Sequence, residues 1–174
     1  DKRNSKPLSP AIIWQDRRTA SYCKTLAAKS PSAKTDNSHD DMASEIQRLT
    51  GLRLDPYFSA SKIAWLLEND PKLRVRANKG EIAVGTIDSW LIYKLTGGEH
   101  VIDVTNACRT LLYDVHKLAW SEELCTCFGI PMNILPKVLP SDGDFGKTKK
   151  GLFAKQIPIQ AVLGDQQAAL FGQG

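Results

Sequence analysis

The chain has 174 residues, with 23 Lys and Arg against 19 Asp and Glu, so its formal net charge is +4 at pH 7. This length suffices for one domain with a hydrophobic core, and 42% hydrophobic with 24% charged residues is ordinary for a globular protein. The basic residues are interspersed, which argues against a nucleic-acid surface, and no apolar run approaches the roughly 20 residues of a membrane span.

The cysteines and histidines do not predict a metal site. None of the four cysteines forms a CxxC pair, and the three histidines are far apart in sequence. Cys125 and Cys127 are two apart in a predicted helix, so their side chains point to different faces. Free thiols are typical of a reducing compartment, and we therefore expect a cytoplasmic protein.

The first half of the chain is predicted to be mostly helical. Asp41 or the residue before it can cap a helix that ends near Leu49, and Gly51 follows as a stop signal. Pro56 pushes the residue before it out of the helical region, so 55–59 should be extended. The remaining expectations are a short strand at 11–14, helices at 17–28, 61–69 and 73–79, and a polar loop at 29–40.

The second half mixes strands and helices. A helix beginning at Thr86 places Ile87, Trp90, Leu91 and Leu95 on one face, and Gly97 ends it. The segments 101–104 and 111–114 could pair as strands. The other expectations are a strand at 82–84, a helix at 121–128 and irregular or edge structure at 130–151.

The last eighteen residues predict a strand, a turn and a helix. An apolar run at 157–163 ends at Gly164, and Asp165 precedes a segment that favours helix. This step would leave Asp165 at the carboxyl edge of a sheet, where open α/β sheets bind ligands. A carboxylate there could accept a proton from a bound hydroxyl, or it could serve only as a helix N-cap.

Five stretches of sequence together resemble the FGGY family of carbohydrate kinases. No GxxxxGK[ST] loop and no GxGxxG motif is present, so this resemblance, and no general phosphate-binding motif, carries the functional interpretation. It implies an α/β fold, as part of a ribonuclease-H-like, actin-like ATPase domain. The five stretches are WQDRRT at 14–19, GLRLDPYFSASKIAWLLEND at 51–70, GTIDSWLIYKLTGG at 85–98, TNACRT at 105–110 and IPIQAVLGDQQAALFGQG at 157–174.

The resemblance implies a domain assignment and a reaction. Residues 1–174 would form the latter part of the family's N-terminal domain, with the phosphate-loop segment before residue 1 and the C-terminal domain after residue 174. The motifs resemble those of members that transfer the γ-phosphoryl group of ATP to glycerol, giving sn-glycerol 3-phosphate. ATP and Mg²⁺ are the implied cofactors, and a homo-oligomer is implied for the full-length protein. The alternatives are an FGGY kinase acting on another polyol or a pentose, and a non-catalytic binding module that keeps the fold.

Four residues match the family's site positions. Asp165 matches the catalytic base, in direct or indirect contact with Mg²⁺, and Gln166 matches a contact to a substrate hydroxyl. Trp14 and Tyr57 match residues that line the glycerol site, where an aromatic wall suits the carbon edge of a small uncharged substrate. Trp14 could otherwise be a core residue at a strand end, and Tyr57 a packed loop residue. Most ATP contacts are expected outside this chain.

Several other residues are expected to have structural roles. Arg17 and Arg18 fit a solvated or salt-bridged helix start, and Arg109 could hold its loop through a buried ion pair. Trp65, Trp90 and Trp120 match no site position and are predicted to lie in the core.

The segment 153–159 differs from the related loop in several bacterial members that are inhibited by fructose 1,6-bisphosphate. Ala154 replaces a glycine and Gln156 replaces an arginine, so a flexible backbone position and a permanent charge are both lost. The resemblance therefore predicts insensitivity to this sugar bisphosphate.

Overall fold

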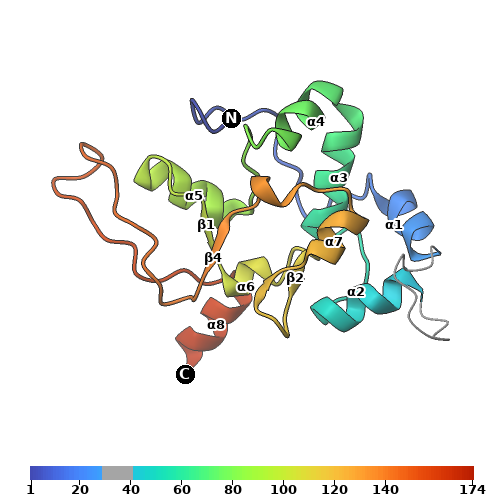
Figure 1. Cartoon of the computed structure of the whole chain (residues 1–174). Coiled ribbons are helices and arrows are strands. Elements are labelled where there is room, and N and C mark those ends of the chain that lie inside the picture. Colours follow the sequence, from blue (N-terminus) through green and yellow to red (C-terminus); the bar gives the residue numbers. More distant parts are fainter. Residues whose placement is uncertain (29–40) are drawn as a thin grey trace. The chain divides into compact units, whose positions relative to one another are not determined.

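The computed structural model describes residues 1–28 and 41–174, and the loop expected at 29–40 lies outside them. Figure 1 traces the helices and strands along the chain. The chain divides into two compact units. Unit 1 consists of Asp1–Ser9, Arg76–Ala107 and Asn133–Gly174, and unit 2 of Pro10–Val75 and Cys108–Met132.

Unit 2 is largely helical. Its fully buried side chains include Ile46 and Leu67 from two helices, Leu112 from a loop and Phe128 from a helix C-cap. Two strands of two residues each form an antiparallel hairpin, in which Tyr113 pairs with Trp120. The elements are α1 (Ala20–Ala27), α2 (Met42–Thr50), α3 (Ser59–Asn69), α7 (Glu122–Cys127), β2 (Tyr113–Asp114) and β3 (Ala119–Trp120), and α4 (Pro71–Asn78) leads into unit 1.

The ends of α2 follow directly from its sequence. The Asp41 side chain accepts a hydrogen bond from the backbone N–H of Ser44, which is the usual N-cap contact. Gly51 ends the helix in the left-handed conformation, with φ of 72°. Both predicted boundaries are confirmed, as are the predicted helices that became α1, α3, α4 and α7 with shifts of a few residues.

Unit 1 is built on a parallel pair of strands. β1 (Val101–Asp103) pairs with β4 (Lys137–Leu139), and Asp103 lies opposite Leu139 at the carboxyl end of both. Ile92, Val101 and Phe145 form a core cluster, against which Leu139, Ile159 and Val162 pack. The other elements are α5 (Ile87–Thr96), α6 (Val104–Ala107) and α8 (Asp165–Gln173), with a 3-10 turn at Met132–Ile134.

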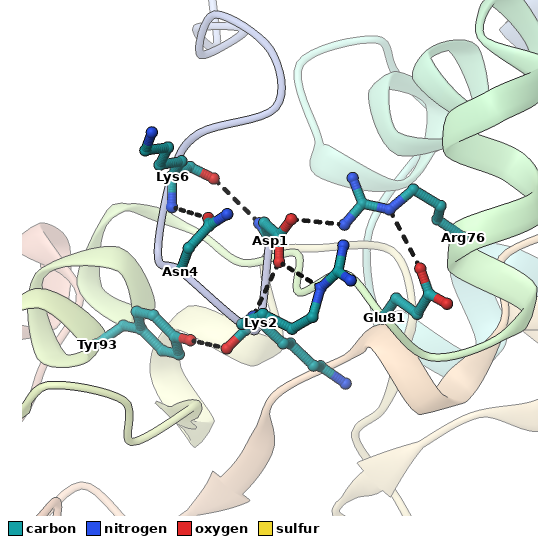
Figure 2. A network of polar contacts seen from close by, with 8 residues as sticks. Asp1, Lys2, Asn4, Lys6, Arg76, Glu81 and Tyr93 are labelled. Atoms are coloured by element: carbon teal, nitrogen blue, oxygen red, sulfur yellow. Dashed lines mark hydrogen bonds and ion pairs between the residues drawn. The ribbon is translucent and has the colours of Figure 1, made fainter.

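The first residues of the chain join unit 1 through polar contacts (Figure 2). The Asp1 carboxylate accepts from Arg76 at 2.8 Å, and the same guanidinium reaches Glu81 at 3.3 Å. The Tyr93 hydroxyl donates to the carbonyl of Lys2 at 3.3 Å. These contacts connect the start of the chain to the ends of α4 and α5.

The apolar run 157–163 is extended, but it does not form a regular strand. Its backbone pairs with residues 141–148: the Ile159 N–H donates to the Gly146 carbonyl at 2.8 Å, and the Val162 N–H to the Ser141 carbonyl at 2.9 Å. Only an isolated bridge at Pro158 is regular. The ladder does not continue past this bridge because Ile159 bonds to both Phe145 and Gly146, two residues against one as in a β-bulge, and because the Ile157 N–H donates to the Thr148 side chain instead of a carbonyl.

Two further predicted strands are wrong. Residues 11–13 belong to no strand, and a turn follows at 13–16, closed by the hydrogen bond from the Asp16 N–H to the Ile13 carbonyl. At 82–84 it is extended, and Val84 bonds singly to Ile134.

The predicted pairing of 101–104 with 111–114 is also wrong. Asp103 ends β1 by accepting from the backbone N–H groups of Thr105 and Asn106. These bonds start α6 at once, so the chain leaves the sheet, and no hairpin can form there.

The buried face of α5 is the opposite of the predicted one. Ser89, Ile92 and Tyr93 are buried. Ile87 and Leu91 are 70% and 53% exposed, and Trp90, which was predicted to lie in the core, is 39% exposed. Apolar residues occur on both faces of this helix, so periodicity alone could not decide between them.

We expect Ile92→Ala to lower the free energy of unfolding of the 174-residue chain by about 2–5 kcal/mol, because it leaves a cavity beside Val101 and Phe145. Leu91→Ala is the matched control on the same helix, and its cost should be below about 1 kcal/mol because Leu91 is largely exposed. Urea unfolding measures both. Equal losses would contradict the observed face.

Candidate active site

Trp14 and Tyr57 lie side by side in unit 2. Their ring centroids are 5.5 Å apart with an interplanar angle of 49°. The residues are 60% and 42% exposed, so Trp14 is not a core residue. An exposed aromatic pair of this kind offers an apolar wall to a small ligand.

A turn at Asp55 presents Tyr57. The Tyr57 N–H donates to the Asp55 side chain at 2.7 Å, and the Phe58 N–H donates to the Asp55 carbonyl at 3.2 Å. The predicted extended conformation of 55–59 is therefore interrupted by a turn, because the Asp55 side chain binds the backbone two residues on.

Arg109 lies against the same aromatic residues. Its guanidinium carbon is 5.1 Å from the Phe58 ring centroid and 5.9 Å from that of Tyr57. The two rings contact each other edge-on, with centroids 5.0 Å apart. Among the described residues no ion pair involves Arg109, so its position is set by cation–π contact instead of the expected ion pair.

Lys62 joins the two segments that carry the aromatic pair. It is 5% exposed, and its ammonium group donates to the carbonyls of Tyr57 at 3.0 Å and Trp14 at 3.4 Å. Burial lowers the pKa of Lys62, and the negative charges of Asp16 and Asp55 oppose this shift. One buried cation thus fixes the backbone of both aromatic residues.

Arg17 and Arg18 are held by ion pairs, as predicted for the start of α1. Arg18 binds Asp16 at 2.7 Å through a forked contact and lies 4.6 Å from the Trp65 ring centroid. The hydrogen bonds from Arg18 lower the pKa of Asp16 to about 2. Arg17 makes a longer contact to Asp55, at 3.9 Å.

Asp165 is the first residue of α8 in unit 1. The N-cap of this helix is Gly164, so the interpretation of Asp165 as the N-cap is wrong. The Asp165 carboxylate is exposed and accepts from the backbone N–H of Gln166 at 2.9 Å. Gln166 is also exposed. Both side chains are accessible to a ligand.

The buried carboxylate of Asp103 lies at the carboxyl end of β1. Its side-chain donors are Thr105 at 2.6 Å, Asn106 at 2.7 Å and Ser141 at 2.7 Å. Burial raises the pKa of Asp103, but the hydrogen bonds from Thr105, Ser141 and Asn106 outweigh it, and the net shift is downward. Asp103 is therefore ionised at neutral pH.

The Asp103 cluster reaches the residue before Asp165. The Gly164 N–H donates to the Thr105 hydroxyl oxygen at 2.7 Å. Gly164 thus lies beside the carboxyl ends of β1 and β4, in agreement with the predicted position at a sheet edge. Asp165 follows directly.

The structure brings the predicted site residues together as two pairs, Asp165 with Gln166 in unit 1 and Trp14 with Tyr57 in unit 2. The described part of the chain contains no cluster of three His, Cys, Asp or Glu that could hold a metal. None of the described helices has both the length and the apolar character needed to cross a membrane.

Sequence reasoning did not assign a role to Lys62, Asp103 or Thr105. A lysine on a helix is typical of a solvated surface, so the pattern gave no sign that Lys62 is buried. Thr105 opens the TNACRT motif, which was a signal of family resemblance without a role for the hydroxyl.

The comparisons with known proteins identify the family. Residues 1–172 match the N-terminal domain of the FGGY family of carbohydrate kinases. The chain belongs to this family. The match confirms the resemblance seen in the motifs and the expected fold class, a partial actin-like ATPase domain of mixed α/β structure.

The similar proteins include glycerol kinases from several organisms. The chain is 52% identical to glycerol kinase of Thermus brockianus and 51% identical to that of Roseobacter denitrificans, each over 99% of this chain and 33% of the relative. The crystal structure of Plasmodium falciparum glycerol kinase with ADP matches with a TM-score of 0.87 and 38% identity, over 99% of this chain and 33% of that one. A xylulose kinase structure from Brucella ovis matches with a TM-score of 0.76 at 22% identity, covering 94% of this chain and 31% of that one, which shows the fold alone. The chain therefore spans about a third of the length of these relatives.

We expect Lys62→Met to destabilise the 174-residue chain by about 1–3 kcal/mol, because the carbonyls of Trp14 and Tyr57 lose a charged donor while the alkyl stem is kept. Lys72→Met, at an exposed position of α4, is the control and should change stability by less than about 0.5 kcal/mol. Urea unfolding decides the matter. If the two variants were equally stable, the buried ammonium would not hold the aromatic segments.

Proposed function

We propose that the protein carrying this chain is an ATP-dependent glycerol kinase, which transfers the γ-phosphoryl group of ATP to a terminal hydroxyl of glycerol. The observation that supports this most strongly is the identity of about half of all positions with glycerol kinases, along essentially the whole chain. In contrast, the sequence identity of this chain to the xylulose kinase structure from Brucella ovis is 22%. Residues 1–174 would form the latter part of the N-terminal domain.

Asp165 acts as the general base in this proposal. Its exposed carboxylate takes the proton of the attacking hydroxyl as the bond to phosphorus forms. Gln166 can donate a hydrogen bond to a neighbouring hydroxyl with its side-chain amide and so orient the substrate. Both residues belong to the first turn of α8.

Trp14 and Tyr57 form the apolar wall of the glycerol site. Glycerol has no charge, so its binding depends on aligned hydrogen bonds and on contact with its carbon edge. The tilted pair of exposed rings supplies such a surface. Arg109 lies against Tyr57 and stiffens the wall.

ATP and Mg²⁺ are the proposed cofactors. The exposed carboxylate of Asp165 suits Mg²⁺, which takes oxygen ligands and is commonly held by one or two carboxylates together with substrate phosphates. When bound, Mg²⁺ offsets negative charge on the phosphates. Homo-oligomeric assembly, a cytoplasmic location and insensitivity to fructose 1,6-bisphosphate stay predictions.

The full-length protein that carries this chain should release ADP from ATP and Mg²⁺ when glycerol is added, with kcat/KM at least about 100-fold higher for glycerol than for D-xylulose. D-xylulose is two carbons longer than glycerol and carries a ketone, so in a site fitted to glycerol it meets steric clashes and leaves hydrogen-bonding groups of the site without their hydroxyl partner, which supports discrimination of this size. A coupled ADP assay measures both rates. A higher kcat/KM for D-xylulose than for glycerol would indicate a pentose kinase. If neither substrate caused ADP release, a non-catalytic binding module would be favoured.

Asp165→Asn should lower kcat about 10²- to 10⁴-fold in the same protein, because the amide keeps the shape of the side chain but cannot take the proton. The KM for glycerol should change little. Asp142→Asn is the control, since Asp142 is an exposed carboxylate elsewhere in unit 1. Turnover near the wild-type value in Asp165→Asn would remove Asp165 from the catalytic role.

A further inference from the structure

We propose that Thr105 is the positioning residue for the Asp165 carboxylate, and that Asp103 orients the Thr105 hydroxyl for this role. The inference rests on the proposed function, in which Asp165 is the base. It adds a series of hydrogen bonds that connects the buried end of β1 to the start of α8, through Asp103, Thr105 and Gly164.

Packing against the described residues does not fix α8. None of its nine residues is buried, and Leu170 and Phe171 are 76% and 82% exposed. The helix also has no side-chain cap at its N-terminus. The position of Asp165 in unit 1 therefore depends on the backbone that leads into the helix.

Gly164, the N-cap residue, connects that backbone to α8. Its N–H donates to the Thr105 hydroxyl at 2.7 Å, and its carbonyl accepts from the Ala168 N–H at 2.8 Å. A Cβ at this position would be 3.5 Å from the Thr105 oxygen and 2.8 Å from the Gln167 side chain, which shows how closely the chain approaches here. A shift at Gly164 moves Asp165 directly.

Asp103 determines which way the Thr105 hydroxyl points. An ionised carboxylate can only accept, so the single hydroxyl hydrogen of Thr105 is directed at Asp103, over 2.6 Å. The lone pairs of the hydroxyl oxygen are then available to the Gly164 N–H. Hydrogen bonds that are linked in this way strengthen one another.

A second set of hydrogen bonds also holds the segment that leads to Asp165. Ser141 donates its hydroxyl to the same Asp103 oxygen at 2.7 Å, and its carbonyl accepts from the Val162 N–H at 2.9 Å. Val162 and Gly164 are two residues apart in an extended segment, so their N–H groups point to the same side. The segment is thus held on both sides of Leu163, with Asp103 at the centre.

The test compares Thr105→Val with Thr105→Ser in the full-length protein. Valine keeps the size of threonine but cannot accept from Gly164, whereas serine keeps the hydroxyl. A displacement of about 1 Å can cost on the order of 10²-fold in rate, so we expect kcat of Thr105→Val to fall about 10- to 100-fold. The KM for glycerol should stay within about 3-fold, and Thr105→Ser should recover most of the rate. Unchanged kcat in Thr105→Val would overturn the proposal.

A double-mutant cycle with Asp165→Asn separates positioning from general damage. If Thr105 acts through Asp165, Thr105→Val should cost less than about 3-fold once Asp165 is already Asn. An equal loss in both backgrounds would show a structural role only. Failure of the proposed function is visible separately, because it would appear as wild-type turnover in Asp165→Asn alone or as no response to glycerol.

Thr148→Val is the matched control. The Thr148 hydroxyl accepts from the Ile157 N–H at 2.9 Å, which is the same kind of link at the other end of the segment that leads to Asp165. The kcat of Thr148→Val should stay within about 3-fold of the wild-type value. A loss as large as that of Thr105→Val would contradict a specific role for Thr105. Thermal unfolding checks that each variant is folded, and Thr105→Ala replaces Thr105→Val in the same cycle if valine prevents folding.

Discussion

A buried carboxylate is stable only where hydrogen-bond donors surround it, and Asp103 imposes this requirement on unit 1. Backbone N–H groups of Thr105 and Asn106 meet the requirement and start α6, so β1 ends where it does. The hydroxyl groups of Thr105 and Ser141 also donate to Asp103, and the Thr105 hydroxyl and the Ser141 carbonyl each accept from the backbone leading to Asp165. One charge thus sets the end of a strand, the start of a helix and the approach to Asp165, the proposed general base.

Unit 2 uses a buried charge of the opposite sign in a similar way. The Lys62 ammonium donates to backbone carbonyls in two segments that are far apart in sequence. Those segments present the exposed rings of Trp14 and Tyr57. In each unit, a buried charge holds the backbone beside an exposed side chain of the proposed site. This arrangement suits catalysis, because accessible groups must still be held in a narrow range of positions.

Local signals in the sequence predicted the local features of the fold. Asp41 and Gly51 defined α2 because capping depends on neighbouring residues only. The partner of β1 could not be predicted, since β4 begins 34 residues after β1 ends and neither strand exceeds three residues. The prediction of which face of α5 is buried was wrong because both faces of this helix carry apolar residues. For the site, motifs predicted Asp165, Gln166, Trp14 and Tyr57, whereas the contact of Thr105 with Gly164 joins residues 59 apart and leaves no local pattern.

The most direct test of the central claim is a crystal structure of the full-length protein with glycerol bound. The proposal predicts a hydroxyl oxygen of glycerol about 2.6–3.2 Å from the Asp165 carboxylate, with the carbon edge of glycerol against Trp14 and Tyr57. The Gly164 N–H should still donate to Thr105 in that structure. Glycerol bound away from these residues, or Asp165 more than about 5 Å from every hydroxyl with no bridging water, would contradict the claim.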